Sequence, residues 1–274
     1  MARRSQALFA VVVLLVLCPV LRADVIVSTT LSLTNLQILP GSGTLDILSG
    51  FGASAFTSVY DSLGGFDQQF NTVTGAATSA NSATSMANAT AAASALKLTE
   101  SASSGVDLSP GVDASAGTNA GAPYGALSGF FMITDSSGNP NVTNPVNVTF
   151  NALLNISQSL TTDQFGFEAT SEVVFNLLLP DIDGNPFLSL DNPLQIGPGG
   201  SLSASSTPTL TGTAGMLTNT QYYLYVETDA ESFGLNTSVP EPSYGGLSAA
   251  LLSLFIVFRA NRGSRSNLNR TRRG

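Results

Sequence analysis

The chain has 274 residues, with 18 acidic and 10 basic side chains and no histidine or tryptophan. Between Asp24 and Val239, 17 acids stand against the single base Lys97 and leave a net charge of −16. This charge excludes nucleic acid as a partner, because binding it requires Lys and Arg to neutralise phosphates. The lack of histidine, and of cysteine after Cys18, excludes Ser-His-Asp triads, cysteine nucleophiles and zinc sites built on those ligands.

The first 23 residues have the layout of a secretory signal peptide. A basic start with Arg3 and Arg4 precedes an apolar core from Ala7 to Val20, and Ala23 places a small residue before the expected cut. We therefore predict a signal helix over residues 1–23 and a mature protein that begins at Asp24.

Residues 24–238 carry the patterns of an exported all-β body, an antiparallel β-sandwich of jelly-roll-like kind. Short runs of alternating apolar and polar residues are separated by clusters of Gly, Asn, Asp and Pro, which mark turns. Many short strands with such turns favour a sandwich. In chain order, the expected strands of this kind are Val25–Leu33, Leu45–Leu48, Ala53–Tyr60, Leu127–Thr134, Ser201–Ser205 and Thr209–Thr213.

The segment Gly75–Leu98 is open to three interpretations. It consists mainly of Ala, Ser, Thr and Asn, and many of its alanines are three residues apart. Alanine favours helices, but a spacing of three leaves no fixed apolar stripe. Closely packed small-residue strands, a helix and a linker therefore all remain open. Residues 99–123, rich in Gly, Ser and Asp, are interpreted as a loop or a domain joint.

The clearest alternation lies in two consecutive runs. Val146 to Ile156 alternates apolar with polar residues, and Phe165 to Leu179 continues this rhythm. We predict an antiparallel hairpin across Ser157–Asp163, with the apolar positions of both strands facing one core.

Asp181, Asp183 and Asn185 form a candidate Ca²⁺ site. Their oxygens occupy alternate positions across a tight turn, and Ca²⁺ prefers oxygen ligands. Pro186 stands where an EF-hand loop needs glycine, so the alternative is a plain Asp-Gly turn. Apart from this ion, no cofactor is expected.

Gln221–Ser232 is a further predicted strand with one buried and one acidic face. Tyr222, Leu224 and Val226 share the first face, while Glu227 and Glu231 lie on the second. This pattern is typical of a sandwich strand.

The C-terminal 36 residues combine a short motif, an apolar run and a basic end. Val239, Pro240, Glu241, Pro242 and Ser243 precede an apolar run of 15 residues, Tyr244–Phe258, and the basic stop that follows includes Arg259, Arg262 and Arg265. A helix of that length spans about 22 Å, less than the roughly 30 Å hydrocarbon core. The arginines are expected on the cytoplasmic side, which places residues 24–238 outside.

This order of features resembles the PEP-CTERM sorting domain of exported bacterial proteins. The resemblance covers Val239–Gly274 only, and the tail after Phe258 is longer than is usual in that family. It implies recognition and cleavage by a membrane exosortase, in a Gram-negative bacterium that makes exopolysaccharide. An ordinary single-pass anchor is the alternative.

Three classes of function follow from these features. The first is a non-enzymatic exported protein of the cell surface or extracellular matrix, anchored in the membrane by its C-terminal helix before processing. Its expected partners are an exosortase and the exopolysaccharide matrix. The second is a carbohydrate-binding module, for which Tyr222, Tyr223 and Tyr225 offer stacking faces. The third is a glycoside-active enzyme that uses two of the acids.

Overall fold

The computed structural model describes residues 25–48, 52–95, 97–108, 114–119, 127–140, 144–163, 166–182 and 185–236. All of them belong to the unit Ala23–Thr237. Within these ranges the chain is all-β and contains no helix, so no helix there is long or apolar enough to cross a bilayer. The expected signal helix at 1–23 and membrane helix at 244–258 lie outside the described residues and stay predictions.

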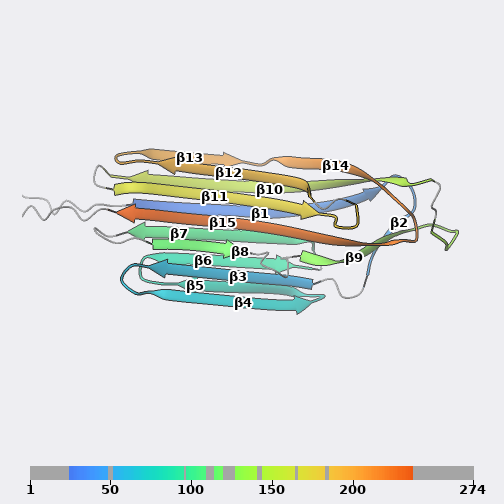
Figure 1. Ribbon diagram of the computed structural model, residues 1–274, viewed down its shortest axis with the longest axis horizontal. Helices are drawn as coiled ribbons and strands as arrows, with labels where there is room; N and C mark the ends of the chain where they lie inside the picture. Colours follow the sequence, from blue (N-terminus) through green and yellow to red (C-terminus); the bar gives the residue numbers. More distant parts are fainter. Residues whose placement is uncertain are drawn as a thin grey trace, which may run out of the picture. The chain divides into compact units, whose positions relative to one another are not determined.

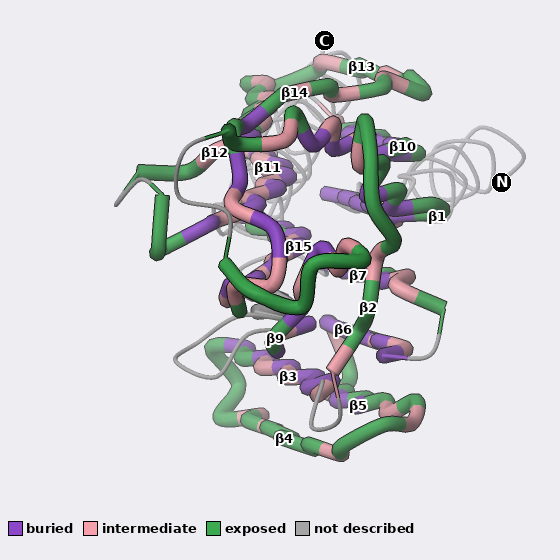
Figure 2. The backbone as a smooth tube through the Cα atoms, turned by 90° about the vertical axis from the view of Figure 1, so that its right-hand side faces the viewer, coloured by how far each residue is buried: buried purple, intermediate pink, exposed green. Residues whose placement is uncertain are grey.

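The strands form two antiparallel sheets that face each other as a sandwich (Figure 1, Figure 2). Sheet A contains, in spatial order, β13 (Ser201–Ser206), β10 (Val146–Thr162), β1 (Val25–Pro40), β7 (Thr99–Leu108), β6 (Ala87–Ser94) and β5 (Ala77–Ala83), with β14 (Thr209–Met216) also paired to β10. Sheet B contains β12 (Pro186–Ile196), β11 (Gly166–Leu178), β15 (Gln221–Asn236), β8 (Ala114–Asn119), β3 (Gly52–Asp61), β9 (Leu127–Thr134) and β2 (Thr44–Ile47), with β4 (Phe66–Thr74) paired to β3.

The core lies between the sheets and follows directly from the period-two alternation. Along β10 the odd-numbered residues face solvent, while Phe150 and Leu154 are fully buried. Phe150 meets Phe131 of sheet B in an edge-to-face contact with ring centroids 6.1 Å apart. Burial of such side chains supplies the main driving force for folding.

A belt of buried polar side chains crosses this core from sheet to sheet. The Thr29 hydroxyl lies 2.7 Å from the Ser171 hydroxyl and 2.8 Å from that of Ser232, which in turn lies 2.9 Å from the Ser104 hydroxyl. The Gln158 amide donates to the Ser171 hydroxyl at 3.0 Å. Because these bonds satisfy the buried hydroxyls, the belt is accommodated between two apolar clusters.

Side chains of β4 cover the edge of sheet A at β5. The Ala83 amide donates to Asp67, the Asn81 amide donates to Gln69, and the Asn71 side chain donates to the Ser79 carbonyl. These three β4 residues alternate along the strand, so they contact β5 at every second position. An uncovered edge strand offers unpaired backbone groups to which another chain can pair. The side chains of β4 cover this edge of β5 and so hinder such pairing.

Most of the predicted strands are confirmed. Val25–Leu33, Leu45–Leu48, Ala53–Tyr60, Leu127–Thr134, Ser201–Ser205 and Thr209–Thr213 each fall on a strand, although several strands are longer. The strand interpretation of 75–98 is also confirmed by β5 and β6. The loop or joint assigned to 99–123 is wrong for most of its length, because it holds β7 and β8; small residues there pack inside sheets rather than forming a loop.

The predicted hairpin between the runs 146–156 and 165–179 is wrong. β10 continues through Thr162 in sheet A, whereas β11 lies in sheet B and pairs with β12 and β15. The two strands face each other across the core, so their apolar residues do share one cluster, as expected. Phe167 departs from the alternation and is exposed, because the register shifts between Gly166 and Glu168.

Candidate functional site

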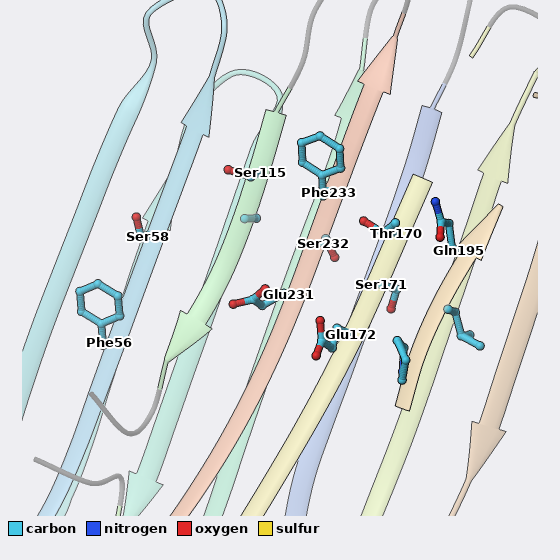
Figure 3. A pocket seen from close by; sticks show the side chains of 13 residues that line it. Phe56, Ser58, Ser115, Thr170, Ser171, Glu172, Gln195, Glu231, Ser232 and Phe233 are labelled. Carbon is cyan, nitrogen blue, oxygen red and sulfur yellow. The ribbon is translucent and has the colours of Figure 1, made fainter. Parts of the chain in front are cut away.

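An open groove of about 700 Å³ crosses the outer face of sheet B. Side chains of β3, β8, β11, β12 and β15 line it (Figure 3). β15 is the middle of these five strands, and β8, which is built largely from alanine, serine and glycine, lies between β15 and β3. We call this feature the sheet B groove.

Two carboxylates stand opposite each other in the sheet B groove. Glu172 of β11 and Glu231 of β15 are direct cross-strand partners (Figure 3). Burial, followed by the charges of Asp191 and Glu231, raises the pKa of Glu172 above its ordinary value. Like charges directly opposite in a sheet are destabilising, so the free groove holds an unfavourable pair.

Aromatic rings flank these acids. Phe233 lies on β15 two residues beyond Glu231, and Phe56 projects from β3 on the other side of the groove (Figure 3). Phe56 is the cross-strand partner of Phe70, and Tyr60 is the partner of Phe66. Tyr60, Phe66 and Phe70 are all exposed, so an aromatic strip continues from the groove over β3 and β4.

The outer faces of the two sheets differ in charge. In the described part of sheet B the outward positions of β11, β12 and β15 include six acids: Glu168, Glu172, Asp191, Glu227, Asp229 and Glu231. In the described part of sheet A the outward face has Asp107 as its acid, and a row of uncharged polar side chains crosses six strands. This row consists of Asn81, Thr90, Ser103, Thr30, Ser157 and Ser205.

Of the three tyrosines expected to offer stacking faces, Tyr223 and Tyr225 lie on the outer side of β15 and are half-buried, whereas Tyr222 lies on the inner side. Tyr222 is buried, and its hydroxyl accepts a hydrogen bond from the Leu217 amide at 2.7 Å. Tyr223 packs edge-on against Phe130, with centroids 5.1 Å apart. The groove instead presents phenylalanines, which the sequence analysis did not single out. These phenylalanines alternate with inward-facing residues along their strands, and that alternation could have placed them on the outer face from the sequence alone.

Glu100 is a buried acid on β7 that the sequence analysis also missed. It points into the core between Leu33 of β1 and Ala93 of β6, its cross-strand partners. Among the described residues, neither its carboxyl group nor the Thr228 hydroxyl has a hydrogen-bond partner. Burial raises the pKa of Glu100 to about 8; the nearby Thr228 hydroxyl opposes this rise and the charge of Glu227 adds to it. The group is therefore mostly protonated at neutral pH.

Asp135 fastens the turn after β9 to the turn before β15. Its carboxylate accepts hydrogen bonds from the Ser137 amide at 2.8 Å and from the Asn219 side chain at 2.7 Å, and also from the hydroxyls of Ser137 and Thr218. These bonds, led by the one from the Ser137 hydroxyl, hold the pKa of Asp135 well below its usual range.

We expect Asp135→Asn to lower the melting temperature at pH 7. An amide cannot accept all four bonds, and the ionised form is the one that they stabilise. Because the pKa of the folded state is depressed, this contribution is present above the ordinary aspartate pKa of about 4 and is lost as the pH falls. The difference in melting temperature between wild type and variant should therefore shrink towards pH 3, and a constant difference would contradict the assignment.

The candidate Ca²⁺ residues are only partly described. One carboxylate oxygen of Asp181 accepts a hydrogen bond from the Tyr223 amide at 2.6 Å, which ties it to β15. Asn185 lies in the turn before β12, and Asp183 lies outside the described residues. Within the described ranges, no group of three His, Cys, Asp or Glu side chains could hold a metal ion. The Ca²⁺ site stays a prediction.

The sorting motif Val239–Ser243 and the arginines Arg259, Arg262 and Arg265 also lie outside the described residues. The last described residue is Asn236 of β15. The assignment of the tail therefore rests on the sequence pattern.

Comparison with known proteins does not place the chain in a family. No family model and no curated protein matches it. Among solved structures, vicilin from hazelnut (Corylus avellana) is 9% identical, with 79% of this chain and 71% of that chain covered and a TM-score of 0.10. At that TM-score the similarity carries no argument about fold or function.

Proposed function

We propose that this chain is an exported, non-enzymatic protein of the bacterial cell surface or extracellular matrix, delivered by its C-terminal signal and processed by an exosortase. The observation that carries the proposal is the order of three features in residues 239–274: the Val-Pro-Glu-Pro-Ser motif, the 15-residue apolar run and the arginine-rich end. The basic start and apolar core of residues 1–23 agree with export of the body.

The described body supports a surface role by its charge distribution. Six of its acids lie on the outer face of sheet B, and a strongly charged face keeps a protein dispersed in solution and steers ligands of opposite charge. The body also needs no disulfide, since the chain has no cysteine after Cys18. A β-sandwich without special chemistry suits a displayed or matrix protein.

The export proposal is tested by following the protein in cell fractions. We expect deletion of Val239–Gly274 to abolish both membrane association and C-terminal processing. Replacing only Pro240, Glu241 and Pro242 by alanine is the matched control, because it keeps the apolar run and the arginines. That variant should stay in the membrane with its tail uncut. If it is processed and located as the wild type, the exosortase proposal fails and a plain anchor takes its place.

The sheet B groove supports carbohydrate binding as a second candidate function. Sugar-binding sites combine flat apolar surfaces with a few polar groups, and Phe56, Phe233, Glu172 and Glu231 provide both. A glycan array with and without Ca²⁺ tests this function. If the protein binds none of the glycans under either condition, the carbohydrate-binding function is rejected. Release of reducing ends from a bound glycan would instead favour the glycoside-active enzyme, since Glu172 and Glu231 form a carboxylate pair.

A further inference from the structure

The acidic face of sheet B selects for a cationic partner. Six outward acids lie on β11, β12 and β15, and Lys97 is the only basic residue between Asp24 and Val239. The body therefore has almost no positive charge of its own to neutralise this face. A polyanion would be repelled, whereas a cation gains from the whole charged surface.

Within this face, the sheet B groove is the place where a cation relieves the most repulsion. Glu172 and Glu231 stand directly opposite each other on neighbouring strands, and Asp191 is close enough to act on Glu172. A positive group between the first two carboxylates would convert an unfavourable pair into two favourable ones.

The aromatic walls of the sheet B groove restrict what kind of cation fits. A small inorganic ion would use the carboxylates but leave the rings of Phe56 and Phe233 facing water. An organic ligand with apolar faces covers those rings, and an ammonium group near a ring gains a further cation–π attraction. The exposed Tyr60, Phe66 and Phe70 continue the aromatic surface over β3 and β4, which suits a ligand of several repeating units.

We infer that the sheet B groove binds an amine-bearing polysaccharide, a chain of amino sugars that lack their acetyl groups. Its ammonium groups meet Glu172 and Glu231, and its sugar rings lie against Phe56 and Phe233. This inference rests on the proposed function, in which the body is displayed where such a matrix polymer occurs. The outer face of sheet A, whose acid in the described residues is Asp107, offers this ligand no comparable attraction.

The inference is tested by calorimetric titration of the exported protein with a β-1,4-linked glucosamine oligomer. Two further ligands separate the contribution of the ammonium charges from that of the sugar rings. The N-acetylated form of the same oligomer has sugar rings but no charge, and spermine has charge but no sugar ring. We expect the glucosamine oligomer to bind at least about tenfold more tightly than either probe, a difference of ~1.4 kcal/mol.

Variants assign this binding to the groove. Glu172→Gln combined with Glu231→Gln should weaken binding of the glucosamine oligomer about tenfold or more, and Phe56→Ala or Phe233→Ala about fivefold. Asp107→Asn removes one charge from the outer face of sheet A and should leave binding unchanged. The altered side chains lie on the outer face of a sheet, and melting curves verify that each variant is folded.

Three outcomes would overturn the inference: no binding of the glucosamine oligomer, equal binding of its acetylated form, or equal binding of spermine with no effect of the phenylalanine variants. Absence of binding by a normally exported protein would reject this inference alone. Failure of export by a protein that still binds the oligomer would reject the proposed surface role and leave the chemistry of the groove intact.

Discussion

Replacing Glu100 by glutamine is expected to remove most of the pH dependence of stability between pH 5 and pH 9. Wild-type Glu100 has its pKa raised by burial to about 8, so the folded state holds a proton that the unfolded state releases above about pH 4.5. The resulting stability is fully present below pH 4.5 and is lost as the pH rises towards 8. The loss is on the order of 5 kcal/mol, at about 1.4 kcal/mol per pH unit.

Urea unfolding of wild type and Glu100→Gln at several pH values measures this effect. The two proteins should be similarly stable at pH 5, and the variant should be the more stable at pH 9, because it carries no charge to bury. Thr228→Val is the control: it removes the facing hydroxyl and keeps the carboxyl, so the pH dependence should persist. A variant that lost stability with pH in parallel with wild type would show that Glu100 is not buried as described.

The second large effect is expected from Thr29→Val in the polar belt. Valine has the shape of threonine but removes the hydroxyl that contacts Ser171 and Ser232 and donates to the Glu231 carbonyl. Leaving buried polar groups without a partner costs about 1–3 kcal/mol. Equilibrium unfolding should show a loss of that size.

Thr30→Val is a matched control for this experiment. Thr30 neighbours Thr29 on β1 but faces solvent, so the same substitution should change the free energy of unfolding by about 0.5 kcal/mol or less. A double-mutant cycle that combines Thr29→Val with Ser171→Ala should give a coupling free energy above about 0.5 kcal/mol, because the two hydroxyls are in contact. Equal effects at positions 29 and 30 would refute the stabilising role of the belt.

Much of the fold was predictable from local alternation. Leu127–Thr134 matches β9, and the buried face of Gln221–Ser232 contains Leu224 and Val226 as expected. Such patterns succeed because one face of each strand is apolar. They also place Glu231 on the outer face of its strand correctly, although they do not show that Glu172 stands beside it. Pairing across a sheet is set by the whole fold rather than by one segment.

The strands that were missed have identifiable physical reasons. β12 contains Pro186 and Pro193, which suggest a turn but are tolerated here because β12 lies at the edge of sheet B. Half of β7 is serine, alanine and glycine, which resembles loop composition, yet the strand packs in the middle of sheet A. Glu100 was missed for a related reason, since an acid in a polar segment is normally exposed.

The most direct test of the central proposal is intact mass measurement of the protein recovered outside the cytoplasm. The account predicts a chain that starts at Asp24 and lacks the apolar run Tyr244–Phe258 together with its arginines. A full-length chain found in the cytosol, with residues 1–23 and 239–274 both still attached, would contradict it.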